Sequence, residues 1–149
     1  MWRLLKEISF KNNNLFIDPV LKGTYPKKLF TYLETKGVVL PAILPGDMEI
    51  IRQELDFLGV NTYSVEYIIA DAGNWPLDLK GVDSGKPRTD AGWEVAQEGM
   101  YDLLKWIDNN YLPKKIIITE NGAACNDWVD IDGRVEGPNR KDYIRRYLI

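Results

Sequence analysis

The stretch Lys115-Ile116-Ile117-Ile118-Thr119-Glu120 decides the fold of this chain. An unbroken run of β-branched residues is typical of a strand that is covered on both faces, as strands of parallel sheets are. We therefore expect a strand over residues 115–119, with Glu120, Asn121 and Gly122 at its carboxyl edge. Enzymes with barrels or α/β sheets place catalytic groups at that edge, so Glu120 is the first residue to consider for chemistry.

The segments around this strand predict alternating strands and helices. Residues 56–63 read as a buried strand, and apolar residues at three-to-four spacing predict a helix over about 95–110. A last helix is expected to begin near Pro138. Strand–helix–strand connections produce parallel sheets, but this order alone does not separate an open sheet from a closed barrel.

The remaining segments are expected to be short or irregular. Asn, Pro and Gly predict loops over residues 11–24 and about 71–92. Short helices are expected over residues 27–36 and 47–53, the second beginning after Gly46. Neither strand–helix turn carries the glycine-rich motif of a nucleotide site.

The composition excludes several kinds of chemistry. The chain has 149 residues, 45% of them hydrophobic, with no histidine and one cysteine, Cys125. The absence of histidine removes Ser-His-Asp and Cys-His catalysis and histidine-ligated zinc. Acid–base chemistry must then come from carboxylates, Tyr, Lys or the cysteine. No residue cluster has metal-ligand spacing, so the pattern gives no support for a metal site.

The charge and hydropathy patterns limit which partners and which cellular compartment we expect. A net charge of −3 argues against a general nucleic-acid binder, which needs a basic face. No apolar run approaches the 18 residues or so that a membrane span needs. Residues 1–10 lack the features of a secretory signal, so a cytoplasmic location is expected.

Two interpretations of Glu120 follow from its position alone. A carboxylate half-buried at a strand end loses hydration and becomes reactive, and perturbed charges concentrate at such sites. The alternative is an exposed loop glutamate that merely follows a strand. The spacing does not decide between them.

Motifs on both sides of the strand resemble family 1 of the glycoside hydrolases, the β-glucosidase family. The run of residues 117–123, Ile-Ile-Thr-Glu-Asn-Gly-Ala, resembles the nucleophile signature of that family. Residues 56–63 resemble the preceding barrel strand, and Thr89-Asp90-Ala91-Gly92-Trp93-Glu94-Val95 resembles the segment that leads into the connecting helix. Motifs near Asp18 and Asp142 occur in the same order, so the resemblance covers roughly residues 12–148.

The resemblance implies a fold and a set of roles. The family is a (β/α)8 barrel, of which this chain would hold about two strands with flanking helices. Glu120 matches the nucleophile that forms a covalent glycosyl-enzyme, and Tyr63 matches the tyrosine that hydrogen-bonds to it. Asn61 matches a polar residue near the substrate. The family acts on terminal β-linked glucose or a similar sugar and needs no metal or cofactor.

Other parts of the family pattern are changed or missing. Substitutions stand at four positions and are expected to be peripheral: Leu15, Thr62, Gln97 and Tyr147, the last where a histidine is common. A minimal barrel needs about 250 residues. The chain has no Thr-Phe-Asn-Glu-Pro-like motif for the acid/base, and the family's last strand would follow Ile149. Residues 1–149 are therefore expected to form one incomplete barrel segment, with 1–11 as a non-matching extension.

A retaining glycosidase needs a second carboxyl group about 5–5.5 Å from the nucleophile. Nothing in the pattern favours any of the available candidates: Glu66, Asp71, Asp90, Glu94 and Glu98. Glu94 and Glu98 lie near a helix start, where favourable interaction with the helix dipole accounts for them.

The loops contain aromatic residues that could stack on a sugar face. Trp75 and Trp93 are expected to serve ordinary loop packing, whereas Trp128 follows Glu120 and is a candidate for sugar binding. Cys125 is expected to be a passive loop residue.

Three functions remain open from the sequence. The chain could act as a β-glycosidase with Glu120 as nucleophile. It could be an inactive barrel fragment that at most binds sugar or a complementing chain, or that self-associates through its open sheet edges. It could also be a different α/β enzyme that uses Glu120 as a general base.

Overall fold

The computed structural model describes residues 13–149, so the expected extension over residues 1–11 lies outside the described residues. The chain divides into two compact units. In the described part, the first unit comprises residues 13–54 and 67–82, and the second comprises residues 55–66 and 83–149. Each unit is described by itself.

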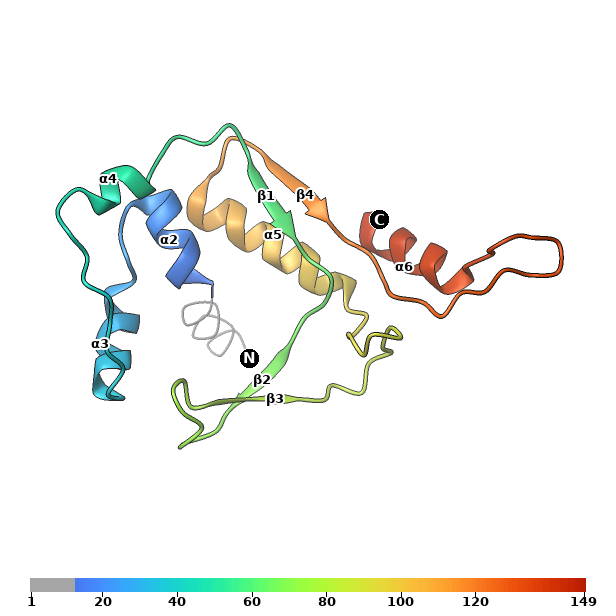
Figure 1. Cartoon of the computed structure of the whole chain (residues 1–149), viewed down its shortest axis with the longest axis horizontal. Coiled ribbons are helices and arrows are strands. Elements are labelled where there is room, and N and C mark those ends of the chain that lie inside the picture. The colour runs from blue at the N-terminus through green and yellow to red at the C-terminus, as the bar shows by residue number, and fades with distance from the viewer. Residues whose placement is uncertain (1–12) are drawn as a thin grey trace. The chain divides into compact units, whose positions relative to one another are not determined.

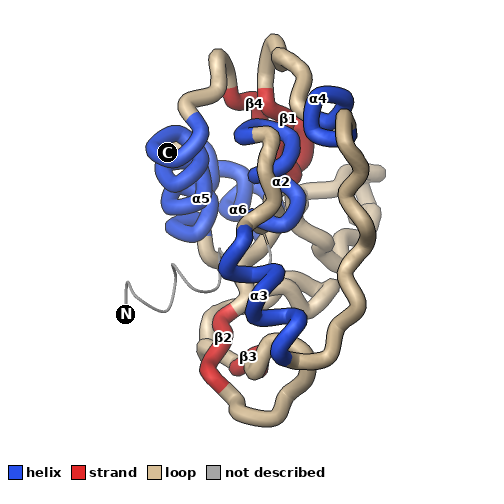
Figure 2. The backbone as a smooth tube through the Cα atoms, turned by 90° about the vertical axis from the view of Figure 1, so that its left-hand side faces the viewer, coloured by secondary structure: helices blue, strands red, loops and turns tan. Residues whose placement is uncertain are grey.

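The second unit is built on two parallel strands (Figures 1 and 2). Strand β1 is Leu58–Asn61 and strand β4 is Ile116–Glu120, and they pair in parallel as predicted. Leu58 lies opposite Ile116, and the register slips by one residue between Val60 and Asn61, so that Asn61 lies opposite Glu120. The carboxyl ends of both strands therefore meet at one edge.

Two helices belong to the same unit. Helix α5 is Gln97–Tyr111, close to the predicted range, and buries Ile107. It ends where Leu112 adopts a left-handed conformation just before Pro113, which cannot continue a helix. Close to the start of the helix, Gly99 lies against Val65, where an added Cβ would overlap the valine Cγ1.

Helix α6 is Pro138–Leu148, and a proline at its start is pre-set for helical geometry. It buries Tyr143 and Tyr147 and leaves its charged residues exposed. The two tyrosines form a small apolar cluster with Ala123. Cys125 packs against this cluster.

The first unit begins with a helix that the sequence did not predict. Helix α2 is Asn14–Lys22, so the prediction of a loop over residues 11–24 is wrong for these residues. Side-chain contacts one turn apart explain the difference. The Asn14 amide donates to Asp18 over 3.2 Å, and Lys22 lies 3.1 Å from the same carboxylate. The helix ends at Gly23, whose φ of 68° favours glycine.

Two short helices follow in this unit. Helix α3 is Lys27–Thr35 and helix α4 is Asp47–Ile51, close to the predicted ranges. Gly46 precedes α4 as expected, and the Asp47 carboxylate accepts the Leu44 N–H over 2.7 Å.

A hairpin completes the first unit. Strands β2, Tyr67–Ala70, and β3, Leu79–Val82, pair antiparallel, so the prediction of a loop over about 71–92 is wrong for residues 79–82. The connection is tied together by Asp78. Its carbonyl accepts the Asp71 N–H over 2.7 Å, and its carboxylate accepts the Gly73 N–H over 3.1 Å. These bonds close the turn so that the glycine- and proline-rich segment returns as a strand.

The architecture is that of an α/β segment, consistent with part of a barrel. It contains the two predicted parallel strands and the four predicted helices α3, α4, α5 and α6. Among the described residues, no helix is both long and apolar enough to cross a membrane.

Candidate active site

The carboxyl ends of β1 and β4 bring three of the four predicted site residues together. Asn61 lies opposite Glu120 in the strand register, and the Thr62 N–H donates to the Glu120 carbonyl over 3.0 Å. Tyr63 follows directly. Residues separated by almost 60 positions thus meet because the carboxyl ends of parallel strands share one edge.

The Tyr63 hydroxyl donates a hydrogen bond to Glu120 Oε2. This bond to the carboxylate raises the pKa of Tyr63 above its usual value, because the neutral phenol is the form that donates. The carboxylate itself is exposed. The tyrosine therefore holds one oxygen of a carboxylate that solvent and ligands can reach.

Asn61 is held by the residue before Glu120. Its side-chain oxygen accepts a hydrogen bond from the Thr119 hydroxyl over 2.6 Å. The amide nitrogen is then the group with which this exposed side chain can donate to a ligand.

Trp93 and Trp128 have different surroundings in the structure. The Trp93 ring packs against Tyr63, with ring centroids 5.2 Å apart and planes at 54°. The sequence assigned Trp93 to loop packing and did not predict its contact with a site residue. Trp128 is 77% exposed, and the loop between β4 and α6 that carries it extends away from the strand pair (Figure 1). Among the described residues, Trp128 forms no hydrogen bond or ring contact with Asn61, Tyr63 or Glu120.

Helix α6 also contacts this strand end. The Tyr143 hydroxyl donates to the Tyr63 carbonyl over 2.7 Å, and the Tyr147 hydroxyl lies 3.4 Å from the same oxygen. Tyr147 also accepts the N–H of Ala96 over 3.1 Å. The expectation that Tyr147 is a peripheral substitution is therefore wrong. Two tyrosines four positions apart on one helix were the available sequence signal, because that spacing places them on one face.

Comparison with known proteins identifies the family of this chain. Residues 5–149 match the profile described as Glycosyl hydrolase family 1. The chain belongs to this family. The match begins at residue 5, within the segment that was expected to lie outside the resemblance.

The similar proteins of this family are considerably longer than the chain. It is 40% identical over 139 residues to a 1,4-beta-D-glucan glucohydrolase of Thermotoga neapolitana, covering 93% of this chain and 32% of that protein. It is 38% identical to Beta-glucosidase A of Thermotoga maritima, covering 93% and 30%. The structure of the Thermotoga maritima beta-glucosidase in complex with noeuromycin aligns with a TM-score of 0.83 at 36% identity, covering 98% and 32%. The chain thus spans about a third of these family 1 proteins.

The second-carboxylate candidates on the family 1 segment are engaged elsewhere. Glu94 is only 5% exposed, and it accepts hydrogen bonds from the Ser84 hydroxyl and, over 2.7 Å, from Arg88. Glu98 forms an ion pair with Lys86. These contacts give both glutamates a structural role.

Two of the three other candidates, Asp90 and Glu66, lie in the second unit with Glu120. Asp90 accepts the backbone N–H of Asn126 and so fastens the loop that follows β4. Glu66 is exposed, and Asp71 belongs to the first unit. Among the described residues, the four candidates of the second unit therefore form no hydrogen bond or ion pair with Glu120.

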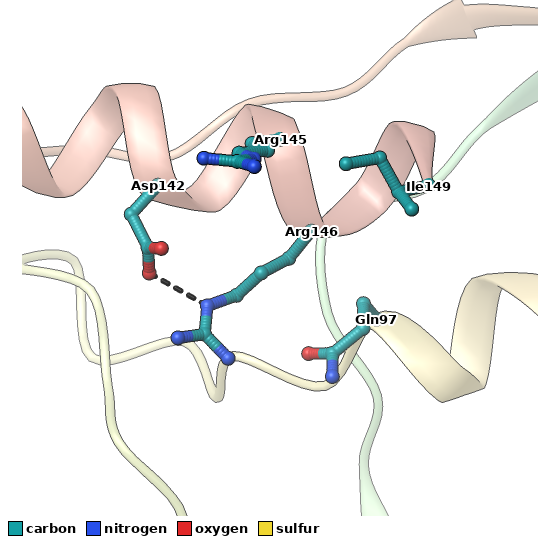
Figure 3. A pocket seen from close by; sticks show the side chains of 5 residues that line it. All are labelled: Gln97, Asp142, Arg145, Arg146 and Ile149. Carbon is teal, nitrogen blue, oxygen red and sulfur yellow. Dashed lines mark hydrogen bonds and ion pairs between the residues drawn. The ribbon is translucent and has the colours of Figure 1, made fainter.

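A surface pocket lies between the start of α5 and the end of α6 (Figure 3). Gln97 lines it from α5. Asp142, Arg145, Arg146 and Ile149 line it from α6, and Arg146 is paired with Asp142 over 2.6 Å. Asn61, Tyr63, Glu120 and Trp128 are not among its lining residues. This pocket is separate from the strand-end site.

Proposed function

We propose that this chain supplies the nucleophile of a retaining β-glycosidase that acts on terminal β-linked glucose or a similar sugar. The hydrogen bond from Tyr63 to Glu120 at the ends of two parallel strands supports the proposal most directly. It links one carboxylate oxygen to a fixed donor, on a segment that belongs to a family whose similar members are named as glucosidases.

In the proposed reaction, a Glu120 carboxylate oxygen attacks the anomeric carbon. The bond between that carbon and the leaving-group oxygen breaks, and the leaving oxygen takes a proton from a second carboxyl group. Water then attacks the glycosyl-enzyme, gives its proton to that group and releases Glu120. Two displacements return the anomeric carbon to its original configuration.

The proposed reaction needs a second carboxyl group that the contacts of Glu120 do not supply. Glu94, Glu98 and Asp90 are each engaged by other partners, so none of them is proposed for the position about 5–5.5 Å from the nucleophile. Because the chain spans about a third of the similar family 1 proteins, we assign the acid/base to the part of the barrel that it does not span.

Two further residues are proposed to bind the sugar. The Asn61 amide lies opposite Glu120 in the register and can donate to a sugar hydroxyl. Trp128 presents an exposed ring on which the apolar face of a sugar can stack. The substrate is therefore a carbohydrate, and no metal or cofactor takes part in these steps.

Covalent trapping tests the nucleophile. The folded chain is incubated with 2,4-dinitrophenyl 2-deoxy-2-fluoro-β-glucoside, and its intact mass is recorded. The activated leaving group needs little acid assistance, so the missing acid/base does not prevent the attack. We expect the mass of one fluorosugar to be added to the wild-type chain and to Glu94→Gln, and not to Glu120→Gln. An adduct that persists in Glu120→Gln would contradict the assignment, and a general base at Glu120 would give no adduct.

A second candidate function is that of an inactive segment that binds a complementing chain. The exposed apolar side chains of the strand pair favour it: Phe57 is 48% exposed and Ile117 is 37% exposed. The same experiment separates the two functions. A folded chain that gains no adduct alone, but gains one after mixing with the remaining two-thirds of a family 1 barrel, would support the second.

A further inference from the structure

We propose that Tyr143 of helix α6 is a positioning residue for the nucleophile: its hydroxyl fixes the main chain of Tyr63 and thereby aims the Tyr63 hydroxyl at Glu120. This inference rests on the proposed function of Glu120. It adds a role for a helix that contributes no side chain to the reacting atoms.

The need for such a residue arises from the way β1 ends. The last bond of the strand ladder at this edge is from the Thr62 N–H to the Glu120 carbonyl. Beyond it, the Tyr63 carbonyl points to α6, where it accepts the Tyr143 hydroxyl over 2.7 Å. A fixed carbonyl fixes the peptide plane after Tyr63, and with it the direction in which the tyrosine side chain leaves the backbone.

Hydrogen bonds connect Glu120, Tyr63, Tyr143 and Asn121 in a closed series. Asn121, which follows Glu120, donates from its side chain to the Thr62 carbonyl over 2.7 Å and to the Tyr143 hydroxyl over 3.3 Å. Tyr143 donates to the Tyr63 carbonyl, and the Tyr63 side chain returns to Glu120. Each strand end is thus tied to Tyr143, so the two ends cannot move independently.

The environment of Tyr143 suits it to this task. The residue is 2% exposed, and its ring stacks on Tyr147 with centroids 4.1 Å apart. Burial raises its pKa, so the hydroxyl keeps its proton at pH values at which a free tyrosine begins to ionise. A buried donor with a fixed ring has few alternative positions.

Two neighbouring contacts support the clamp. Tyr147, one turn along, approaches the same Tyr63 carbonyl at 3.4 Å. Arg140, one turn before Tyr143, donates to the Ala123 carbonyl over 3.0 Å and pairs with Asp127 over 2.5 Å. One face of α6 therefore holds β1 through two tyrosines and holds the loop after β4 through an arginine.

The test uses the ionisation of Tyr63 as a direct report on its bond to Glu120. The full chain is labelled with tyrosine carrying ¹³C at Cζ, and each ring is titrated by NMR, with Tyr63→Phe identifying the Tyr63 resonance. In the wild type we expect Tyr63 to titrate above 10.0, because it donates to a carboxylate. In Tyr143→Phe, which removes only the hydroxyl, its pKa should fall towards 10.0. Tyr147→Phe should cause a smaller fall, because its bond is longer.

Two controls separate positioning from general destabilisation. Ile107→Val removes a buried methyl group from α5 and should lower Tm without moving the titration of Tyr63. Tyr101→Phe, at a ring that is 65% exposed, should change neither. If Tyr143→Phe is too unstable to titrate, Tyr147→Phe, which loosens the hold on the same Tyr63 carbonyl, gives a second measurement: an unchanged Tyr63 titration there would count against the clamp.

The outcomes distinguish this inference from the proposed function. A folded Tyr143→Phe in which Tyr63 titrates as in the wild type would overturn the positioning role, whatever happens in the trapping experiment. Failure of the wild-type chain to form an adduct, both alone and after mixing with the remaining two-thirds of a family 1 barrel, would instead count against the nucleophile. If both hold, Tyr143→Phe should form the adduct about 10-fold more slowly than the wild type, because a loosely held nucleophile is less often in the geometry of attack.

Discussion

Each unit of the chain contains a tyrosine that donates a hydrogen bond to a carboxylate. In the first unit, Tyr32 donates to Asp78 over 2.7 Å. Asp78 also lies 2.6 Å from the Lys36 ammonium and accepts the Gly73 N–H, and these partners lower its pKa to about 2. In the second unit, Glu120 accepts from Tyr63 and meets no cation among the described contacts.

The difference teaches which carboxylate can react. A carboxylate that is bound by an ammonium, a phenol and a backbone N–H has its lone pairs committed, and it serves to close a turn. A carboxylate that is held by one phenol is oriented and still has lone pairs for attack on carbon. A hydrogen bond from a tyrosine hydroxyl therefore does not identify a nucleophile. The other partners of the carboxylate have to be considered.

The largest expected effect sharpens this comparison directly. Removing the hydroxyl in Tyr63→Phe should slow trapping of the chain by the fluorosugar about 100-fold, as expected when a reacting group is displaced by about 1 Å. Tyr32→Phe makes the same chemical change at the other pair and should leave the trapping rate unchanged. Adduct formation followed by intact mass measures both rates. Equal rates in the two variants would contradict the distinction drawn between the pairs.

A third carboxylate, that of Glu94, shows how strongly a buried carboxylate depends on a neighbouring cation for stability. Arg88→Met leaves Glu94 buried without its cation, and the free energy of unfolding should fall by about 2 kcal/mol. The value is below that for a fully buried pair because the Arg88 side chain is 41% exposed. Urea denaturation measures the change. A loss no greater than that of Lys141→Met, at an exposed ion pair, would show that Glu94 does not depend on Arg88.

Glycine substitutions test how tightly each unit is packed. In the second unit, Gly99→Ala places a methyl group against the stiff Val65 side chain and should cost about 1–2 kcal/mol. In the first unit, Gly23→Ala meets only the flexible Arg52 side chain, so its cost of about 1 kcal/mol comes from the positive φ. Gly122→Ala has open space and should be nearly neutral. A Gly99→Ala protein as stable as Gly122→Ala would contradict the close contact with Val65.

The smallest expected effects are pH dependences of opposite sign. The pKa of Asp78 is lowered from 3.8 to about 2, so its contribution to stability is complete above 3.8 and is lost as the pH falls through 2. The pKa of Tyr63 is raised above 10.0, so its contribution is complete below 10.0 and is lost as the pH rises through the raised value.

Thermal unfolding of variants measures both effects. The difference in Tm between the wild type and Asp78→Asn should shrink as the pH falls from about 4 towards 2. The difference between the wild type and Tyr63→Phe should shrink as the pH rises above 10.0. A constant difference in either titration would mean that the corresponding bond does not contribute through its charged partner.

The sequence predicted what periodicity and residue type determine. The parallel pairing of β1 and β4 follows from two apolar runs joined by a helix, and the edge position of Glu120 follows from the end of the second run. The prediction failed for α2, because Asn and Pro suggest a loop while the contacts from Asp18 to Asn14 and Lys22 support a helix. It also missed β3, because the turn that returns the chain depends on Asp78.

The contacts of the site were predictable only where a motif carried them. The position of Glu120 followed from the pattern, and Tyr63 and Asn61 came from the resemblance to the family. The hydroxyls of Tyr143 and Tyr147 were not predicted, since residues 80 and 84 positions away from Tyr63 meet it only in the folded chain. The exposed position of Trp128 likewise depends on the path of a loop that has no periodicity.

The distance along the chain between Tyr63 and helix α6 has a consequence for synthesis. A ribosome adds about 5–20 residues each second, so several seconds separate the emergence of Tyr63 from that of Tyr143. During this interval the nascent chain comes to contain all four proposed site residues while the Tyr63 carbonyl still lacks the hydroxyl that holds it. A nascent chain arrested just before Tyr143 would contain all four proposed site residues but would lack the hydroxyl that orients Tyr63.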